Sequence, residues 1–201
     1  MPGKRGRPRR YDPETALTQA MALIWDQGYA ETSLDDLSQA TGMNRPSLYG
    51  AFGDKRALYL ATLVHYREVS RQAIDRVLGH DEPLRQALER FFRAALEFYL
   101  SGAAGQRGCF LIGTATTGAV LDPEIRTMLR EALRGFDGKL EARLRLAVGQ
   151  GDLPATADPA QLARLVSAMQ HSMAIRARAG ETREALEAMA AAAIALICGP
   201  A

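Results

Sequence analysis

The chain has 201 residues, of which 47% are hydrophobic, so it can bury a core without disulfides or bound metal. Its formal net charge of +2 is unevenly distributed. Five basic residues lie in the first ten positions, which leaves 20 of the 25 basic side chains against 23 acidic ones in the rest of the chain. A basic end on a weakly acidic body indicates a confined contact with a polyanion and argues against a whole surface devoted to one.

The cysteines and histidines show no pattern typical of a disulfide framework or a metal site. Cys109 and Cys198 are far apart and lack CxxC spacing, and His65, His80 and His171 lack the spacing of metal ligands. We therefore expect no metal and no cofactor. The sequence also lacks GxSxG, HExxH and a phosphate-binding glycine loop, which predicts that the protein is not an enzyme and has no catalytic residue.

The N-terminus is not typical of a targeting segment. Its basic residues are not followed by an apolar run, and no apolar stretch reaches membrane-spanning length. We expect no membrane partner and a cytoplasmic location, where cysteines stay reduced.

Residues 1–10, MPGKRGRPRR, contain too little apolar surface for a core. We expect them to form a disordered basic arm in the free protein. The extended Arg-Gly-Arg-Pro sequence fits a DNA minor groove, where the negative potential attracts the guanidinium groups of Arg5 and Arg7. The alternative is a solubilising or localisation tail.

Three short helices are predicted after the arm. The first begins with Asp12 as its N-cap, with Pro13 in its first turn, and ends near Gln27 at Gly28. The second has Ser33 as its N-cap and ends at Gly42. Its first turn is acidic, and its apolar stripe consists of Leu34, Leu37 and Ala40.

The third helix begins near Asn44 and carries Pro46 in its first turn, where the missing N–H costs nothing. Its spacing places Leu48, Ala51 and Phe52 inward. Two helices that cross over a glycine turn, the second polar and cationic, are typical of a helix-turn-helix that lays its second helix in the DNA major groove. The outward face would carry Arg45, Ser47, Tyr49 and Gly50.

The rest of the chain also follows helical periodicity, so the predicted fold class is all-α. Asp54 caps a long helix that begins at Lys55 and ends near Leu78. The segment GCFLIGTATTGAV is uncharged and reads as a buried helix or, as a less favoured alternative, a strand. Further helices are predicted over 82–101, from 122 to glycines 149 and 151, over 159–179 and over 181–197.

The stretch TSLDDLSQATGMNRPSLYGAFGDKRALY, preceded by a helix that ends in Gly-Tyr, resembles the TetR/AcrR family of one-component transcriptional regulators. The resemblance covers Tyr11–Tyr59. It implies a helix-turn-helix DNA-binding domain over 11–57, following the arm, and a helical regulatory and dimerisation domain over 58–201, with the long helix shared. It also implies a homodimer through the last two helices, which otherwise would bury their apolar faces internally.

The resemblance further implies the DNA contacts. Phosphate would be bound by the hydroxyls at the start of the second helix, by Tyr49 and by Lys55. Arg45 is the candidate for bidentate reading of guanine. Double-stranded DNA, in the form of a palindromic operator, is therefore the expected partner. The full set of expected DNA-binding residues is Arg5, Arg7, Thr32, Ser33, Arg45, Pro46, Ser47, Tyr49, Gly50 and Lys55.

A repressor released by a small, largely apolar effector is the function that the resemblance favours. A pocket among the central helices would combine aromatic and methionine side chains with a few polar groups. One alternative is a sensor of oxidants or electrophiles that acts through Cys109, and another is a DNA-binding module without a small-molecule inducer. The expected ligand-binding residues, each of which could equally be a core residue, are Phe91, Phe92, Phe98, Tyr99, Cys109, Met128, Met169, His171 and Met173.

Overall fold

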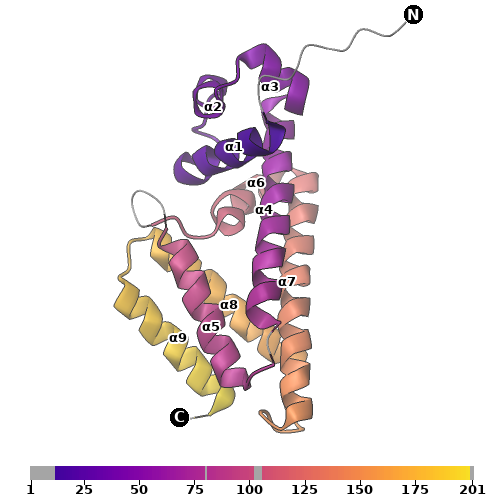
Figure 1. Cartoon of the computed structure of the whole chain (residues 1–201), viewed down its shortest axis with the longest axis vertical. Helices are drawn as coiled ribbons and strands as arrows, with labels where there is room; N and C mark the ends of the chain where they lie inside the picture. The colour runs from indigo at the N-terminus through magenta and orange to yellow at the C-terminus, as the bar shows by residue number, and fades with distance from the viewer. Residues whose placement is uncertain (1–11, 80, 102–105, 200–201) are drawn as a thin grey trace, which may run out of the picture. The chain divides into compact units, whose positions relative to one another are not determined.

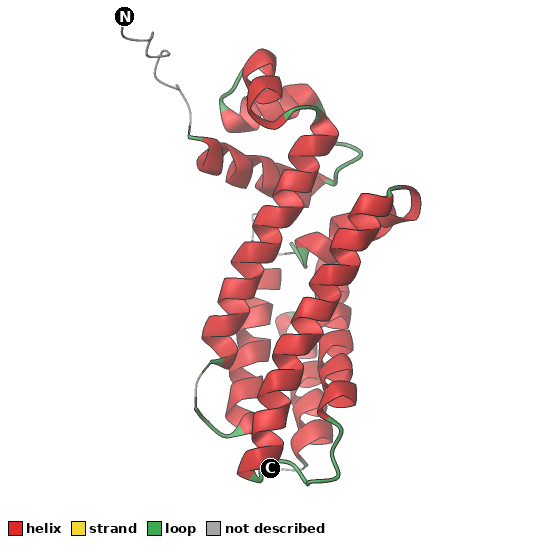
Figure 2. Ribbon diagram, turned by 90° about the vertical axis from the view of Figure 1, so that its right-hand side faces the viewer, coloured by secondary structure: helices red, strands yellow, loops and turns green. Residues whose placement is uncertain are grey.

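The computed structural model describes residues 12–79, 81–101 and 106–199. These residues form nine α-helices and one π-helical turn and include no strand (Figures 1 and 2). The predicted all-α fold is confirmed. The chain divides into two compact units, Met1–His65 and Tyr66–Ala201, and the division falls within the helix that begins at Lys55.

The first unit contains three short helices and the beginning of a long one, and local capping explains where they start. Asp12 and Asn44 accept hydrogen bonds from the backbone N–H groups of Thr15 and Ser47, each three residues further on. Asp54 does the same for Ala57. The helices are α1 (Pro13–Gln27), α2 (Leu34–Thr41), α3 (Arg45–Phe52) and α4 (Lys55–Leu78).

The turn between α2 and α3 depends on Gly42, whose φ of 65° lies in the left-handed region that favours glycine. Leu48 of α3 is buried as predicted, whereas Ala51 is exposed and its predicted inward position was wrong. An eight-residue helix presents only a narrow stripe to its neighbours. The core of this unit is made by Ala16, Ala20, Ile24, Trp25, Leu37, Met43, Leu48, Leu58, Tyr59 and Leu63.

The second unit is a bundle in which α5 lies beside α9 and α7 packs along α8 (Figure 1). Its elements are the C-terminal part of α4, α5 (Leu84–Tyr99), α6 (Thr116–Leu121), α7 (Pro123–Gln150), α8 (Pro159–Arg178) and α9 (Arg183–Cys198). The predicted apolar stripe of α5 forms the centre of the core. That core includes Leu84, Leu88, Phe91, Phe92, Leu96, Leu140, Leu144, Val166, Met173, Leu186 and Ile194.

The segment predicted as a buried helix is helical, with a π-helical turn over Leu111–Ala115 that leads into α6. Its burial was predicted too broadly, because Val120 at its end is exposed. Of the two glycines predicted to end α7, one does so. Gly149 lies inside the helix, and Gly151, with φ 85°, is its C-cap.

Candidate nucleic-acid interface and regulatory cavity

The N-terminus of α2 is closed by a reciprocal pair of hydrogen bonds. The Ser33 hydroxyl accepts from the backbone N–H of Asp36 at 3.1 Å, and the Asp36 carboxylate accepts from the Ser33 backbone N–H at 2.8 Å. The same carboxylate accepts from the Ser33 hydroxyl at 2.6 Å. These bonds, the side-chain one first, lower the pKa of Asp36. Ser33 is therefore the predicted N-cap, and its exposed position keeps it within reach of a ligand.

Thr32 does not occupy the position that its expected phosphate contact requires. Its side chain is only 1% exposed, and its hydroxyl donates to the Gly28 carbonyl at 2.7 Å. A buried hydroxyl that already donates its proton cannot reach a phosphate without leaving its partner unsatisfied. This geometry leaves Thr32 as a structural residue that fastens the loop before α2 to the end of α1.

The outward face of α3 is presented as predicted. Arg45, Pro46, Tyr49 and Gly50 are exposed, and Ser47 is half-buried. Pro46 lies in the first turn, where a backbone N–H has no partner within the helix, so the N–H that proline lacks costs no hydrogen bond. The expected contacts of the arm, Arg5 and Arg7, lie outside the described residues.

Arg45 has a partner that the sequence pattern did not reveal. Its Nε donates to Oδ1 of Asp35 at 2.8 Å and its Nη2 donates to Oδ2 at 2.6 Å. Both side chains are mainly exposed, Arg45 by 56% and Asp35 by 73%. The hydrogen bond that Arg45 donates to Asp35 raises the pKa of Arg45, which keeps the guanidinium charged.

Lys55 is positioned by an aromatic stack at the start of α4. Its Nζ lies 4.6 Å from the centroid of the Tyr29 ring, and that ring stacks on Tyr59 with the centroids 4.2 Å apart. Tyr59 is buried, so it anchors the stack to the core. The Gly-Tyr that ends α1 thus orients a cation whose charge remains available to phosphate.

The second unit contains a cavity of about 550 Å³ that is open to solvent on one side, a size that suits a small molecule. It is lined by the C-terminal part of α4 together with α5, α7, α8 and residues 109 and 111. Five of the expected residues line it: Phe91, Phe98, Tyr99, Cys109 and His171. The sequence analysis missed its other main contributors, which include Tyr66, Ser70, Ile74, Phe136 and Gln170.

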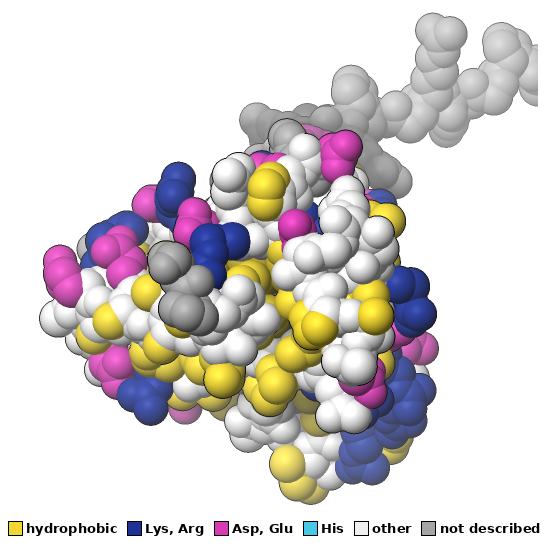
Figure 3. All heavy atoms as spheres, turned by 90° about the horizontal axis from the view of Figure 1, so that it is seen from below, with side chains coloured by type: hydrophobic (Ala, Val, Ile, Leu, Met, Phe, Trp, Pro, Cys, Tyr) yellow, Lys and Arg dark blue, Asp and Glu magenta, His cyan; other side chains and the backbone are white. Residues whose placement is uncertain are grey.

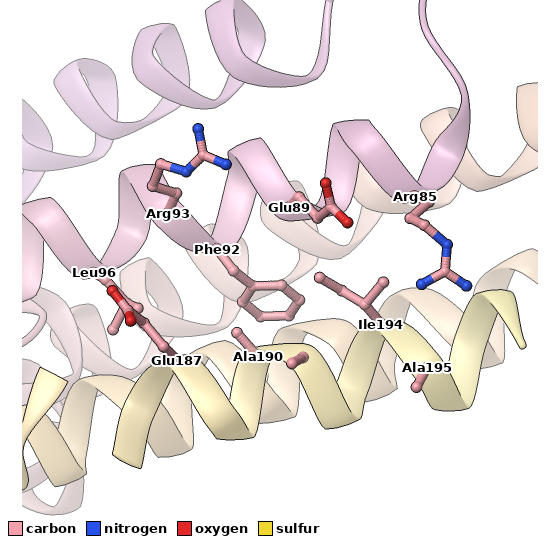
Figure 4. A pocket seen from close by; sticks show the side chains of 10 residues that line it. Arg85, Glu89, Phe92, Arg93, Leu96, Glu187, Ala190, Ile194 and Ala195 are labelled. Carbon is pink, nitrogen blue, oxygen red and sulfur yellow. The ribbon is translucent and has the colours of Figure 1, made fainter. Parts of the chain in front are cut away.

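Four expected lining residues lie elsewhere. Met173 is fully buried in the core, and Met169 packs against that core. Phe92 points toward α9 and the floor of a separate groove between α5 and α9, of about 360 Å³, where it faces Ala190 and Ile194 (Figure 4). Met128 on α7 is half-buried outside the cavity. Adjacent residues of a helix point about 100° apart, so Phe91 and Phe92 face different neighbours.

The polar groups inside the cavity are held uncharged. The Tyr66 hydroxyl and the Cys109 sulfur are 3.2 Å apart, and burial raises the pKa of both groups. Burial also raises the pKa of Tyr99, against a hydrogen bond with Gln170, and lowers the pKa of His171. The His171 ring lies 5.8 Å from the ring of Phe136. The interior thus presents neutral donors and acceptors among aromatic rings.

The position of Cys109 depends on the glycine before it. Gly108 has φ 62°, and a Cβ added there would lie 2.7 Å from the carbonyl oxygen of Ala174. Only glycine lets this loop approach α8 so closely. The close approach of the loop at Gly108 to α8 therefore places Cys109 in the cavity wall, just before the π-helical turn.

Ion pairs join α4 to α7 near the cavity. Arg67 pairs with Glu131 at 3.1 Å, and Lys139 pairs with Asp75 at 2.5 Å. Arg67, Glu131 and Lys139 are among the residues that line the cavity. Charge therefore lies at the edge of the cavity, where solvent can screen it, and the interior is aromatic.

The described residues contain neither a cluster of metal-ligating side chains nor a helix of membrane-spanning character. No group of three or more His, Cys, Asp or Glu side chains within residues 12–79, 81–101 and 106–199 has an arrangement that could hold a metal ion. None of the described helices combines the length and apolar character needed to cross a bilayer.

Comparison with known proteins identifies the family. Residues 16–62 match the profile of the bacterial regulatory proteins of the tetR family, and residues 83–193 match the tetracyclin repressor-like C-terminal domain. The chain belongs to the TetR family. The resemblance found over Tyr11–Tyr59 is confirmed, and the C-terminal match extends it into the second unit. The first unit, Met1–His65, is called the DNA-binding unit below, and the second, Tyr66–Ala201, the regulatory unit. This TetR-family protein is a DNA-binding transcriptional regulator.

The relatives agree with the family match. The HTH-type transcriptional repressor ComR of Escherichia coli (strain K12) is 32% identical over 199 residues, 96% of this chain and 91% of ComR. The repressor BdcR of the same organism is 33% identical over 107 residues, 53% of this chain and 54% of BdcR. A cysteine mutant of the TetR family regulator CifR, complexed with 26-bp operator DNA, superposes with a TM-score of 0.86 at 29% identity, over 96% of this chain and all of that one. These relatives are transcriptional regulators.

Proposed function

We propose that this TetR-family protein is a homodimeric repressor that binds a palindromic operator and is released by a small, largely apolar ligand. The observation that carries the proposal is a cavity with aromatic rings and uncharged polar groups in its interior, one wall of which is α4. The same helix begins at Lys55 in the DNA-binding unit. A ligand that binds one arrangement of α4 better than another therefore shifts the population of DNA-binding states.

The proposed DNA contacts divide by chemistry. Ser33 with the N-terminus of α2, the Tyr49 hydroxyl and Lys55 bind phosphate and set the register of the protein on the duplex. Arg45 reads a guanine, and Pro46, Ser47 and Gly50 line the groove beside it. Arg5 and Arg7 of the arm add minor-groove contacts. CifR in its complex with operator DNA and the repressor ComR support this assignment by similarity.

The proposed dimer uses the outer faces of α8 and α9. Leu165 and Ile175 on α8 are 54% and 58% exposed, and Leu196 on α9 is 78% exposed. Such side chains on a helix face favour burial against a second copy. Figure 3 shows that apolar side chains also run across the lower end of the molecule, with charged side chains gathered toward its edges. Two copies would place two α3 helices about 34 to 36 Å apart on successive turns of the major groove.

The chemistry of the cavity limits the proposed ligand. Tyr66, Tyr99, Gln170 and His171 offer hydrogen bonds from neutral groups, and His171 holds no proton charge at neutral pH because burial lowers its pKa. A ligand with a full charge would lose its hydration without gaining a buried partner of opposite sign. The favoured class is therefore an uncharged aromatic or alicyclic molecule with one or two oxygen atoms.

Two glycines of α7 provide a matched test of the ligand proposal. Gly135 lines the cavity and Gly138 does not, and a Cβ added to either meets no atom within 4 Å. Gly135→Leu should narrow the cavity, whereas Gly138→Leu should have the same effect on helix propensity without filling it. A thermal-shift screen of uncharged small molecules should find compounds that raise the Tm of the wild-type protein and release it from a selected duplex. The same compounds should act equally well on Gly138→Leu. Both effects should be weaker in Gly135→Leu.

Two results would contradict the ligand proposal. Equal responses of the two leucine variants would place the ligand outside this cavity. A screen without any compound that both raises Tm and releases DNA would favour a DNA-binding module without a small-molecule inducer. Neither result would affect the assignment as a DNA-binding regulator.

An electrophile that enters the cavity would meet Cys109, which supports sensing by this cysteine as a second candidate function. The raised pKa of the thiol opposes it, because a protonated thiol is a poor nucleophile. The test is Cys109→Ser. If an oxidant or electrophile releases DNA equally from wild type and variant, sensing through Cys109 is excluded.

A further inference from the structure

The ion pair between Asp35 and Arg45 links the two helices of the helix-turn-helix. Asp35 lies in the first turn of α2 and Arg45 is the first residue of α3. Two parallel N–H···O bonds of 2.8 and 2.6 Å join the carboxylate to the Nε and Nη2 side of the guanidinium. This fork-to-fork geometry fixes the plane and direction of the guanidinium, which a single bond would not do.

The pair leaves the reading edge of Arg45 open. A guanidinium has five N–H groups, and the bonds to Asp35 use two of them. The three that remain include one N–H on Nη1 and one on Nη2 that point in parallel, away from Asp35. This is the donor pair that matches O6 and N7 of guanine in the major groove. The Arg45 side chain as a whole is 56% exposed, so DNA can approach it.

Capping does not account for Asp35, although its carboxylate, in the first turn, also favours the dipole of α2. The capping box of α2 is completed by its neighbour Asp36, whose carboxylate binds the backbone and side chain of Ser33. An ion pair between two side chains as exposed as Asp35 and Arg45 adds little to the free energy of unfolding. An aspartate on a DNA-facing helix also repels phosphate, so its presence there calls for a compensating role.

We propose that Asp35 is a positioning residue for base readout, which holds Arg45 in its reading orientation before DNA arrives. The inference rests on the proposed function, namely that Arg45 reads a base. Without Asp35, the long Arg45 side chain loses conformational entropy when the operator binds. This entropy cost reduces affinity for the operator, where the guanidinium is held against a base, and does not reduce affinity for random DNA. Asp35→Asn should therefore reduce the ratio of operator to random-DNA affinity about two- to twelvefold.

The same substitution has an opposite effect on binding that does not depend on sequence. Removal of one negative charge from the DNA-binding unit should strengthen binding to any duplex. Glu31, an exposed carboxylate in the loop before α2, provides the matched control for this charge effect. Glu31→Gln should strengthen binding to operator and random DNA alike and leave their ratio unchanged.

The experiment compares wild type, Asp35→Asn, Glu31→Gln, Arg45→Ala and the double variant Asp35→Asn/Arg45→Ala. Wild-type protein first selects its preferred duplex from a randomised library, and each variant repeats the selection. Fluorescence anisotropy at one fixed salt concentration then measures affinity for the selected duplex and for a scrambled duplex of the same composition. Trp25, buried in the DNA-binding unit, reports by its fluorescence whether each variant is folded.

The expected result is a loss of the affinity ratio in Asp35→Asn, with relaxed selection at the same base position that Arg45→Ala relaxes. In the Arg45→Ala background, Asp35→Asn should change the ratio no more than Glu31→Gln does. The proposal would be overturned if Asp35→Asn left the ratio unchanged and raised both affinities as Glu31→Gln does. Asp35 would then contribute only a charge that repels DNA. A raised ratio would also overturn the proposal, because Asp35 would then restrain Arg45. If Arg45→Ala keeps the full ratio, base reading by Arg45 fails and the role of Asp35 fails with it.

Discussion

The two units of this protein build their functional surfaces from opposite kinds of interaction. In the DNA-binding unit, the proposed contact residues lie on the outward faces of short helices whose ends are set by caps three residues away. In the regulatory unit, the cavity is assembled from α4, α5, α7 and α8, which are distant in sequence. Local hydrogen bonds can therefore define an exposed DNA-reading surface, whereas a cavity between helices requires long-range packing.

The largest expected effect would show whether the two units are separately stable. Leu48 is buried in the DNA-binding unit, and Leu48→Ala should lower the free energy of unfolding of that unit by about 2–5 kcal/mol. Trp25, the one tryptophan of the chain, is buried in the same unit, so its fluorescence follows that transition selectively. Far-UV circular dichroism follows both units. Leu88→Ala, in the core of the regulatory unit, is the control.

The expected pattern is an early Trp25 transition in Leu48→Ala, with most helical signal retained, and the reverse order in Leu88→Ala. If the fluorescence and dichroism transitions coincide in both variants, the two units unfold as one cooperative structure. The units would then differ in how their functional surfaces are built but not in their stability.

The next effect distinguishes the two kinds of DNA contact. Arg45→Ala should cost about 1–3 kcal/mol of discrimination between the selected duplex and a scrambled one, because a base contact is lost. Lys55→Ala should weaken both duplexes equally and reduce the dependence of affinity on salt. Anisotropy titrations at several salt concentrations measure both quantities. Equal losses on both duplexes for Arg45→Ala would remove that residue from base readout.

A smaller effect compares local capping in the two units. Ser33→Ala removes the N-cap of α2 and should destabilise the DNA-binding unit by about 1 kcal/mol, seen in the Trp25 transition. Thr182→Ala removes the N-cap of α9 and should act on the regulatory unit instead. A shift of the Trp25 transition by Thr182→Ala as large as that by Ser33→Ala would show that caps act beyond their own unit.

The smallest expected effect is a dependence of stability on pH in the regulatory unit. Burial lowers the pKa of His171 below its unfolded value of 6.5, so the unfolded state binds a proton first as the pH falls. Stability should therefore decline as the pH falls through about 6.5 and level off below the folded pKa of His171. Urea midpoints of wild type and His171→Gln between pH 8 and pH 5 test this, because His65 and His80 are common to both proteins. Parallel pH profiles would exclude His171 as the source.

The sequence was most informative where one residue and its near neighbours decide the structure. Asp12, Ser33 and Gly42 each have a role that depends on atoms within four residues, so the helix ends of the DNA-binding unit could be predicted closely. Thr32 was harder to place. A hydroxyl next to an N-cap can face DNA or bind the preceding loop, and only the position of the Gly28 carbonyl decides between these.

The candidate sites show the same limit more clearly. The outward position of Arg45 follows from helical periodicity, but its pairing with Asp35 depends on the angle between α2 and α3. Phe91 and Phe92 are chemically identical, yet one lines the cavity and the other lies in the groove beside α9 (Figure 4). Met169 and Met173, both expected at the cavity, instead adjoin or fill core space, as flexible apolar side chains often do.

By itself, the sequence determined the all-α class, the capped helices, the helix-turn-helix and the family, since each depends on residues close together along the chain. Only the tertiary structure decided that Thr32 is buried, that Asp35 holds Arg45, and which aromatic side chains surround the cavity. The physical reason is that periodicity specifies which face of a helix is apolar, whereas the neighbour of that face is decided by how all the helices pack.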